Sequence, residues 1–200
     1  MPAGSGSDQL QDRVLTVPNV ISLARLGLIG VFLYLLLIAR ADGPAVAILM
    51  LSGASDWADG KVARLFNQYS RLGALLDPAI DRLYMITIPV AFGVRGLVPW
   101  AIIATLLARD LLLAATLPVL RSRGLTALPV TYIGKAGTFA LMSAFPLILL
   151  GQWDQLWSRV VLSAGWGFLI WGLGMYLWAF VLYLIHVRLA VRTMPKVAGD

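Results

Sequence analysis

Four aspartates stand in two closely spaced pairs within apolar sequence. Asp56 and Asp59 are three residues apart, and Asp77 and Asp81 are four residues apart. On a helix, each of these spacings places both members of a pair on the same face. Carboxylate oxygens are the preferred ligands of hard divalent cations such as Mg²⁺, Mn²⁺ and Ca²⁺, and four carboxylates can bridge two ions. The spacing therefore predicts two helices that together present a site for two cations.

The composition indicates that these helices lie in a membrane. Of the 200 residues, 60% are apolar and 13% are charged, against roughly 25% charged in an ordinary soluble domain, and the mean hydropathy is +0.83. Cysteine and glutamate are absent and there is one histidine. The absence of cysteine excludes disulfides and Cys-ligated metals, and a single histidine makes a zinc site or a Ser-His-Asp triad an unfavourable interpretation. The net charge of +6 forms no contiguous basic stripe, so we expect no nucleic-acid partner.

Basic residues surround the aspartates, so structural salt bridges are an alternative to a ligand site. The candidates are Lys61, Arg64, Arg71 and Arg82. Charges within a span cost about 2.5–3.5 kcal/mol each at mid-bilayer and usually mark functional sites. Gly60 and Gly73 lie beside the two pairs, where the missing side chains let a bulky ligand approach the backbone. Two matched pairs with adjacent glycines favour the ligand site.

About 20 helical residues cross a bilayer core, and on that scale the chain is predicted to be an all-α integral membrane protein with a bundle of six transmembrane helices. The expected spans are Pro18–Ala39, Pro44–Phe66, Leu72–Val94, Val98–Leu120, Pro129–Gly151 and Arg159–Val187. Short connections make neighbouring spans antiparallel. Residues 1–15 are expected to be a disordered or interfacial N-terminal segment, residues 16–192 the six-helix domain and residues 193–200 a polar C-terminal tail.

The distribution of basic residues predicts the orientation. With six spans both termini share one side, and that side holds Arg13, Lys61, Arg64, Arg71, Arg121, Arg123, Arg188, Arg192 and Lys196, against Arg40, Arg95 and Arg159 on the other. The positive-inside rule then places both termini in the cytosol. If the second span ends near Phe66 and the third begins near Arg71, the aspartates lie roughly 10 Å inside the cytosolic surface at 1.5 Å per residue.

The spacing around the aspartates resembles a known family signature. The string Asp56-x2-Asp59-Gly60-x2-Ala63-Arg64-x8-Gly73-x3-Asp77-x3-Asp81 matches the signature of the CDP-alcohol phosphatidyltransferases at every fixed position. Eight specified positions make a chance match a roughly one in 10¹⁰ event. The opening Val17-Pro18-Asn19-Val20-Ile21-Ser22-x-x-Arg25 is similar to the first helix of that family, so the resemblance covers nearly the whole chain.

The resemblance implies a reaction and a role for each motif residue. Members of the family move a phosphatidyl group from CDP-diacylglycerol to an alcohol and release CMP, or use a CDP-headgroup with diacylglycerol. By resemblance, two Mg²⁺ or Mn²⁺ ions are held by Asp56, Asp59, Asp77 and Asp81, and Asp81 is also the general base. The nucleotide and its diphosphate are expected at Asn19, Gly60, Ala63, Arg64 and Gly73. The resemblance also implies a homodimer, in the cytoplasmic membrane of a bacterial type of cell, with the active site facing the cytosol.

The acceptor alcohol is less sharply defined. The blocks Leu107-Ala108-Arg109-Asp110-Leu111 and Tyr132-Ile133-Gly134-Lys135-Ala136-Gly137-Thr138 resemble the glycerol-type branch, and Arg109-Asp110 resembles the cardiolipin synthases, which use phosphatidylglycerol. Glycerol 3-phosphate is the alternative, and inositol phosphate is a weaker one. Arg109, Lys135 and Arg25 are the candidate acceptor-binding residues, although Arg109 could simply pair with Asp110.

Functions of two other classes compete with this interpretation. Carboxylates within a membrane also mark ion-coupled transporters, but such proteins show broken helices and internal repeats, and neither is visible in the sequence. A non-catalytic membrane scaffold would give no reason for four aligned carboxylates. No Ser, Cys or His is placed to form a covalent intermediate, so the sequence favours direct in-line transfer.

Overall fold

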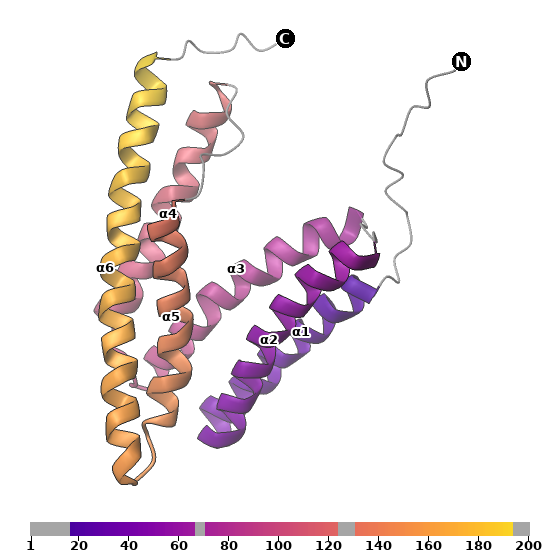
Figure 1. Ribbon diagram of the computed structural model, residues 1–200, viewed down its shortest axis with the longest axis vertical. Coiled ribbons are helices and arrows are strands. Elements are labelled where there is room, and N and C mark those ends of the chain that lie inside the picture. The colour runs from indigo at the N-terminus through magenta and orange to yellow at the C-terminus, as the bar shows by residue number, and fades with distance from the viewer. Residues whose placement is uncertain (1–16, 67–70, 124–130, 194–200) are drawn as a thin grey trace. The chain divides into compact units, whose positions relative to one another are not determined.

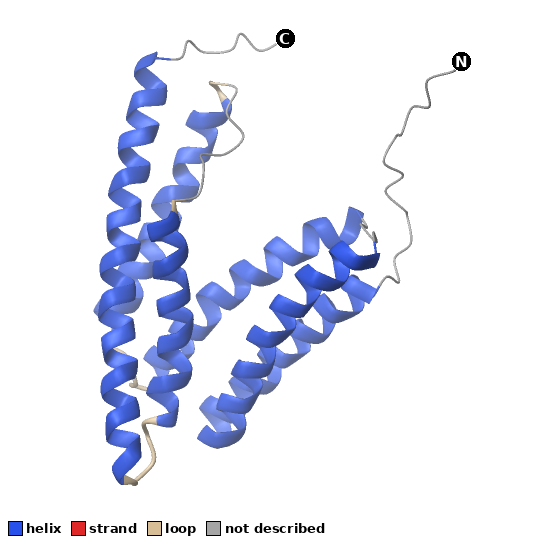
Figure 2. Ribbon diagram, viewed as in Figure 1, coloured by secondary structure: helices blue, strands red, loops and turns tan. Residues whose placement is uncertain are grey.

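The computed structural model describes residues 17–66, 71–123 and 131–193, and these residues are helical apart from short turns (Figure 2). The predicted N-terminal segment 1–15 and most of the C-terminal tail 193–200 lie outside the described residues. In chain order the elements are α1 (Val17–Leu33), the π-helix η1 (Tyr34–Ile38), α2 (Asp42–Phe66), α3 (Arg71–Val94), α4 (Trp100–Arg121), α5 (Tyr132–Leu150) and α6 (Leu156–Thr193) (Figure 1).

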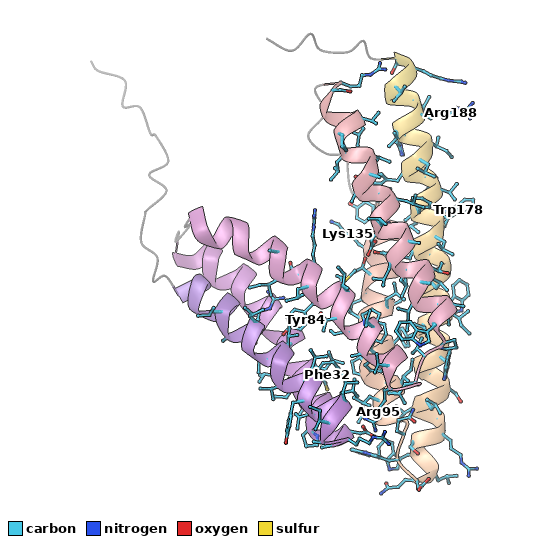
Figure 3. All side chains as sticks on the ribbon, turned by 180° about the vertical axis from the view of Figure 1, so that it is seen from behind. Phe32, Tyr84, Arg95, Lys135, Trp178 and Arg188 are labelled. Carbon is cyan, nitrogen blue, oxygen red and sulfur yellow. The ribbon has the colours of Figure 1, made fainter. Side chains whose placement is uncertain are left out.

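The chain divides into two compact units, one ending at Ala91 and the other beginning at Phe92. In the first unit α1 packs along α2, and the contact buries Phe32 and Leu36 together with Ala45, Val46 and Leu49 of α2. Helix α3 joins this unit through a cluster that contains Ile29, Ile80 and Tyr84. Figure 3 labels Phe32 and Tyr84 on these helices.

The end of the first helix departs from regular α-helix. Residues Tyr34–Ile38 form a π-helical turn, in which the Ala39 amide donates to the Tyr34 carbonyl at 2.9 Å. Arg40 then adopts a left-handed conformation with φ of 49°, which ends the helix and reverses the chain. The sequence predicts a connection between the spans Pro18–Ala39 and Pro44–Phe66, but α2 already begins at Asp42, so the turn is tighter than the sequence predicts.

In the second unit α5 packs along α6 through small residues. A Cβ atom built on Gly165 would lie 2.8 Å from the Ile148 backbone nitrogen, and one on Gly172 would lie 3.0 Å from the Leu141 backbone nitrogen. A side chain at Gly165 would clash with this backbone, and one at Gly172 would push the neighbouring helix by a few tenths of an ångström, so small residues let the two backbones lie close together. Gly165 and Gly172 therefore allow α5 and α6 to pack closely.

Polar groups connect α4 to α6. The Arg109 guanidinium lies over the Tyr176 ring, with Cζ 3.8 Å from the centroid. Asp110 accepts hydrogen bonds from Arg109 Nη1 at 3.0 Å and from the Tyr176 hydroxyl at 2.5 Å. Near the C-terminal end of α6, Arg123 Nη1 donates to the Val191 carbonyl at 2.9 Å. This bond satisfies one of the last carbonyls of α6, which have no partner within the helix.

Three helices in the described part of the chain are long and apolar enough to cross a membrane: Trp100–Leu120, Tyr132–Leu150 and Leu156–Thr193. A shorter apolar helix covers Leu23–Ile38. Helix α6 has 38 residues, about 57 Å at 1.5 Å per residue, whereas the bilayer core is about 30 Å thick. It therefore extends beyond the predicted span Arg159–Val187 and ends in a turn with Arg192, whose charge interacts favourably with the helix dipole.

The close contact of α5 with α6 makes a testable prediction about stability. Gly165→Ala places a methyl group against the Ile148 backbone, and we expect a loss of about 1–3 kcal/mol from overpacking. Gly167→Ala is the matched control, because a Cβ there meets no atom within 4 Å and the gain in helix propensity is the same in both variants. Thermal unfolding in detergent should give a lower Tm for Gly165→Ala alone; equal Tm values would contradict the contact.

Candidate active site

The motif residues lie on the first three helices. Asn19 lies in α1; Asp56, Asp59, Gly60, Ala63 and Arg64 lie in α2; Gly73, Asp77 and Asp81 lie in α3. The backbone is helical at every one of these positions, so the members of each aspartate pair share a helix face as their spacing predicts. Among the four motif aspartates, Asp81 is the one whose side chain the structure describes.

Arg25 and Asp81 form an ion pair between α1 and α3. Arg25 Nη2 donates to Asp81 Oδ1 at 2.8 Å, a length typical of strong, charge-assisted hydrogen bonds. The Arg25 side chain is 7% exposed, whereas the Asp81 side chain is 51% exposed. The basic partner of Asp81 is therefore a buried residue of α1, and the carboxylate remains accessible on its other side.

Tyr84 ties the backbone of α1 to α2 and α3. Its hydroxyl oxygen lies 2.9 Å from the Arg25 carbonyl oxygen and 2.8 Å from the Ser52 hydroxyl. A phenol has one proton to donate, so Tyr84 donates to the carbonyl and accepts from Ser52. The Tyr84 ring also lies near the Arg25 guanidinium, with Cζ 5.4 Å from the centroid. Both Tyr84 and Ser52 are buried, so these bonds are shielded from water.

Tyr84 and Ser52 are not evident as site residues from the sequence alone. Tyr84 follows Asp81 by three residues and so lies on the same side of α3, which is the one local signal that links it to the motif. Ser52 carries no such signal, because a serine in an apolar helix commonly bonds to its own backbone. The pairing of Arg25 with Asp81 joins residues 56 positions apart and has no local signature.

The predicted cation site lies mostly outside the described side chains. Within the residues described, no three carboxylate or imidazole groups are close enough to share a metal ion, and the side chains of Asp56, Asp59 and Asp77 are not among them. The donor set itself consists of carboxylate oxygens, and these are the ligands that Mg²⁺ and Mn²⁺ take in proteins. The chemistry of the donors thus fits a divalent cation.

The candidate acceptor residues of the second unit differ in their surroundings. Arg109 is mostly buried and is engaged by Asp110 and by the Tyr176 ring, as the alternative of a local pair predicts. Lys135 is exposed near the start of α5 (Figure 3), with its Nζ 5.9 Å from the centroid of the Tyr132 ring. Lys135 is therefore the more accessible of these two cations.

Comparison with known proteins identifies the family and gives three informative relatives. The model of the CDP-alcohol phosphatidyltransferase family matches residues 15–191. A Mycobacterium tuberculosis protein named "Putative cardiolipin synthase" is 65% identical over 189 residues, which are 94% of this chain and 90% of the relative. The "Cardiolipin synthase (CMP-forming)" of Streptomyces coelicolor is 45% identical over 194 residues, 94% of this chain and 89% of the relative.

A more distant relative carries the name of the alternative activity. The "CDP-diacylglycerol--glycerol-3-phosphate 3-phosphatidyltransferase" of Cereibacter sphaeroides is 32% identical over 143 residues, 68% of this chain and 64% of the relative. None of these names describes a transporter, and the family match extends over the three helices that carry the motif. The chain is thus an enzyme of the membrane, and it belongs to the CDP-alcohol phosphatidyltransferase family.

Proposed function

We propose that this enzyme transfers a phosphatidyl group from CDP-diacylglycerol to phosphatidylglycerol and releases CMP, which is the reaction of a cardiolipin synthase. The observation that carries the proposal is the 45% identity to the CMP-forming cardiolipin synthase of S. coelicolor along 94% of this chain. The relative with the glycerol-3-phosphate name is 32% identical along 68% of the chain. Glycerol 3-phosphate is therefore the second candidate acceptor.

The charges near the candidate acceptor residues favour the same choice. Asp110 engages Arg109, so this pair contributes little net positive charge to a ligand. Lys135 is then the main cation of the two. Phosphatidylglycerol carries one negative charge on its phosphodiester, whereas glycerol 3-phosphate carries nearly two and needs a stronger cluster of cations. One accessible lysine fits the singly charged lipid better.

The four aspartates are proposed to hold two divalent cations, Mg²⁺ or Mn²⁺, through Asp56, Asp59, Asp77 and Asp81. When bound, such ions supply positive charge that polarises the diphosphate and stabilises the CMP leaving group. Asp59 and Asp77 lie on different helices, so the site requires α2 and α3 to be antiparallel neighbours. The nucleotide is proposed to lie against Asn19, Gly60, Ala63, Arg64 and Gly73, with the Arg64 guanidinium suited to phosphate.

Asp81 is proposed to be the general base. A base must come within hydrogen-bond reach of the acceptor hydroxyl, and the half-exposed Asp81 carboxylate keeps Oδ2 outside its ion pair with Arg25. The carboxylate takes the hydroxyl proton while the hydroxyl oxygen forms a bond to the phosphorus of the phosphatidyl group. The bond from that phosphorus to the CMP oxygen breaks in the same in-line displacement.

The membrane arrangement is proposed to be six spans within residues 16–192, with both termini and the active site on the cytosolic side. Helices α2 and α3 have 25 and 24 residues, enough at 1.5 Å per residue to cross a core about 30 Å thick. The water-soluble CDP group then meets the site from the cytosol while the acyl chains stay in lipid. We further propose a homodimer in a bacterial cytoplasmic membrane, as the family resemblance implies.

The acceptor is tested with purified protein in nanodiscs. CMP release from CDP-diacylglycerol with Mg²⁺ should be fast with phosphatidylglycerol, and at least tenfold slower with glycerol 3-phosphate or inositol phosphate, because the one accessible lysine matches a single negative charge. The product should contain four acyl chains by mass spectrometry. Use of glycerol 3-phosphate with no use of phosphatidylglycerol would overturn the cardiolipin assignment and leave the second candidate.

The cation site is tested by removing carboxylate charge. Asp56→Asn and Asp77→Asn should each lower kcat about a hundredfold or more, because loss of a cation removes several kcal/mol of charge stabilisation. Asp81→Asn should lower it by about 10²–10⁴-fold, the contribution of a general base. Asp154→Asn is the matched control, since Asp154 is an exposed carboxylate in the turn before α6. Near-normal activity in any two of the three motif variants is incompatible with the proposed site.

The role of Lys135 is tested by Lys135→Gln, which keeps most of the side-chain length but removes the charge. We expect the acceptor KM to rise about tenfold or more, and the donor KM to stay within about twofold, because the lost interaction is with the acceptor alone. The donor KM measured on the same protein is the internal control. Equal rises in both KM values would show that Lys135 does not select the acceptor.

A further inference from the structure

The Arg25 side chain is a buried cation whose surroundings are built from three helices. It lies on α1 with 7% of its side chain exposed, and an arginine in such a place is costly unless it is paired. Its Nη2 donates to Asp81 of α3. Its own backbone carbonyl accepts from Tyr84 of α3, which also bonds to Ser52 of α2. Both the guanidinium and the backbone of Arg25 are therefore held.

Apolar packing also fixes the position of Tyr84, which bonds to Arg25. Tyr84 belongs to the core cluster with Ile29 of α1 and Ile80 of α3, against which Leu33 and Ile88 also pack. The side chain of Tyr84 has few rotamers available when its ring is buried and its hydroxyl has two partners. Because Arg25 and Tyr84 are bonded at the backbone carbonyl, the level of α1 relative to α3 is set by this cluster.

The pair is strongly asymmetric in exposure. Arg25 is buried, whereas half of the Asp81 side chain is exposed. A salt bridge that served stability alone would gain little from a partner so open to solvent. In this pair the rigid, buried member is the cation, and the accessible member is the carboxylate. Arg25 therefore holds one carboxylate oxygen of Asp81, Oδ1, and leaves Oδ2 outside the ion pair.

We propose that Arg25 is a positioning residue for Asp81, and that Tyr84 and Ser52 hold Arg25 in place. The inference rests on the proposed role of Asp81 as the general base. Arg25 fixes the carboxylate through Oδ1, so that Oδ2 meets the acceptor hydroxyl with little loss of orientation. Arg25 acts through Asp81 and does not contact the acceptor, in contrast to the acceptor-binding role for which the sequence makes it a candidate.

The test is a double-mutant cycle on kcat, with the wild-type enzyme, Arg25→Gln, Asp81→Asn and the double variant in nanodiscs with CDP-diacylglycerol, phosphatidylglycerol and Mg²⁺. Arg25→Gln should lower kcat about 10- to 100-fold, as expected for a misplaced reactive group, and leave both KM values within about twofold. In the Asp81→Asn background the same substitution should have no further effect, because the group it positions is gone.

Two other outcomes would overturn the proposal. If Arg25 binds the acceptor directly, Arg25→Gln raises the acceptor KM, and its effect persists in the Asp81→Asn background. If Arg25 serves the fold alone, the Tm falls and the losses in kcat multiply. Arg159→Gln is the matched control for removing a guanidinium, because Arg159 is exposed on α6 and has no part in the site.

Conservative variants keep the test decisive if Arg25→Gln does not fold. Arg25→Lys retains the charge and should recover part of the lost kcat. Tyr84→Phe keeps the buried ring but removes both hydroxyl bonds, and should lower kcat about three- to tenfold with unchanged KM values. Wild-type kcat in both of these variants would overturn the proposal.

A binding measurement separates the base from the nucleotide site. The Kd of CDP in the presence of Mg²⁺, measured by calorimetry, should be unchanged in Arg25→Gln and in Tyr84→Phe, because neither residue is assigned to the nucleotide. If wild-type protein releases no CMP with any acceptor, the proposed function fails. If wild-type protein is active and Arg25→Gln is equally active, the positioning role alone fails.

Discussion

A full charge buried among apolar helices has to be matched by an opposite charge, and in the first unit this requirement falls on Arg25. Its guanidinium is 7% exposed and pairs with Asp81, while Tyr84 bonds to the Arg25 backbone and to Ser52. Removing one member of such a buried pair leaves the other uncompensated, which costs more than the pair contributes. The contact of α1 with α3 therefore depends on these polar groups as well as on the apolar cluster around them.

In the second unit a mostly buried arginine is likewise paired with an aspartate and lies beside a tyrosine. Arg109 pairs with its neighbour Asp110, and Tyr176 of α6 donates to that carboxylate while its ring lies under the guanidinium. The difference is in exposure and partners. Arg109 takes its carboxylate partner from its own helix, α4, whereas Arg25 of α1 takes a carboxylate from α3. The Arg109 pair stabilises the packing of α4 against α6, and the Arg25 pair holds a carboxylate that is half exposed.

The aspartate motif and the described candidates for membrane spans lie in different parts of the chain. The helices that are long and apolar enough to span a membrane, among those described, belong to the second unit, whereas α2 and α3 carry the aspartate motif. A donor such as CDP-diacylglycerol has a water-soluble nucleotide and two acyl chains, so an enzyme that acts on it needs polar groups close to lipid. Charges close to lipid are costly, and the aspartate motif concentrates them on the two helices that are proposed to hold the cations.

The sequence by itself determined the helices, the motif and the family. Helical periodicity and hydropathy are local properties, so the predicted helix order agrees with the structure, and the ends of α2 and α3 differ from the predicted spans by at most two residues. The aspartate spacing is local as well, and it identified the reaction class. The tertiary structure decided that Asp81 pairs with Arg25, 56 residues away, and that Tyr84 and Ser52 support that pair. Such contacts depend on how each helix is rotated about its axis, and that rotation is settled by packing of the whole unit rather than by any local run of residues.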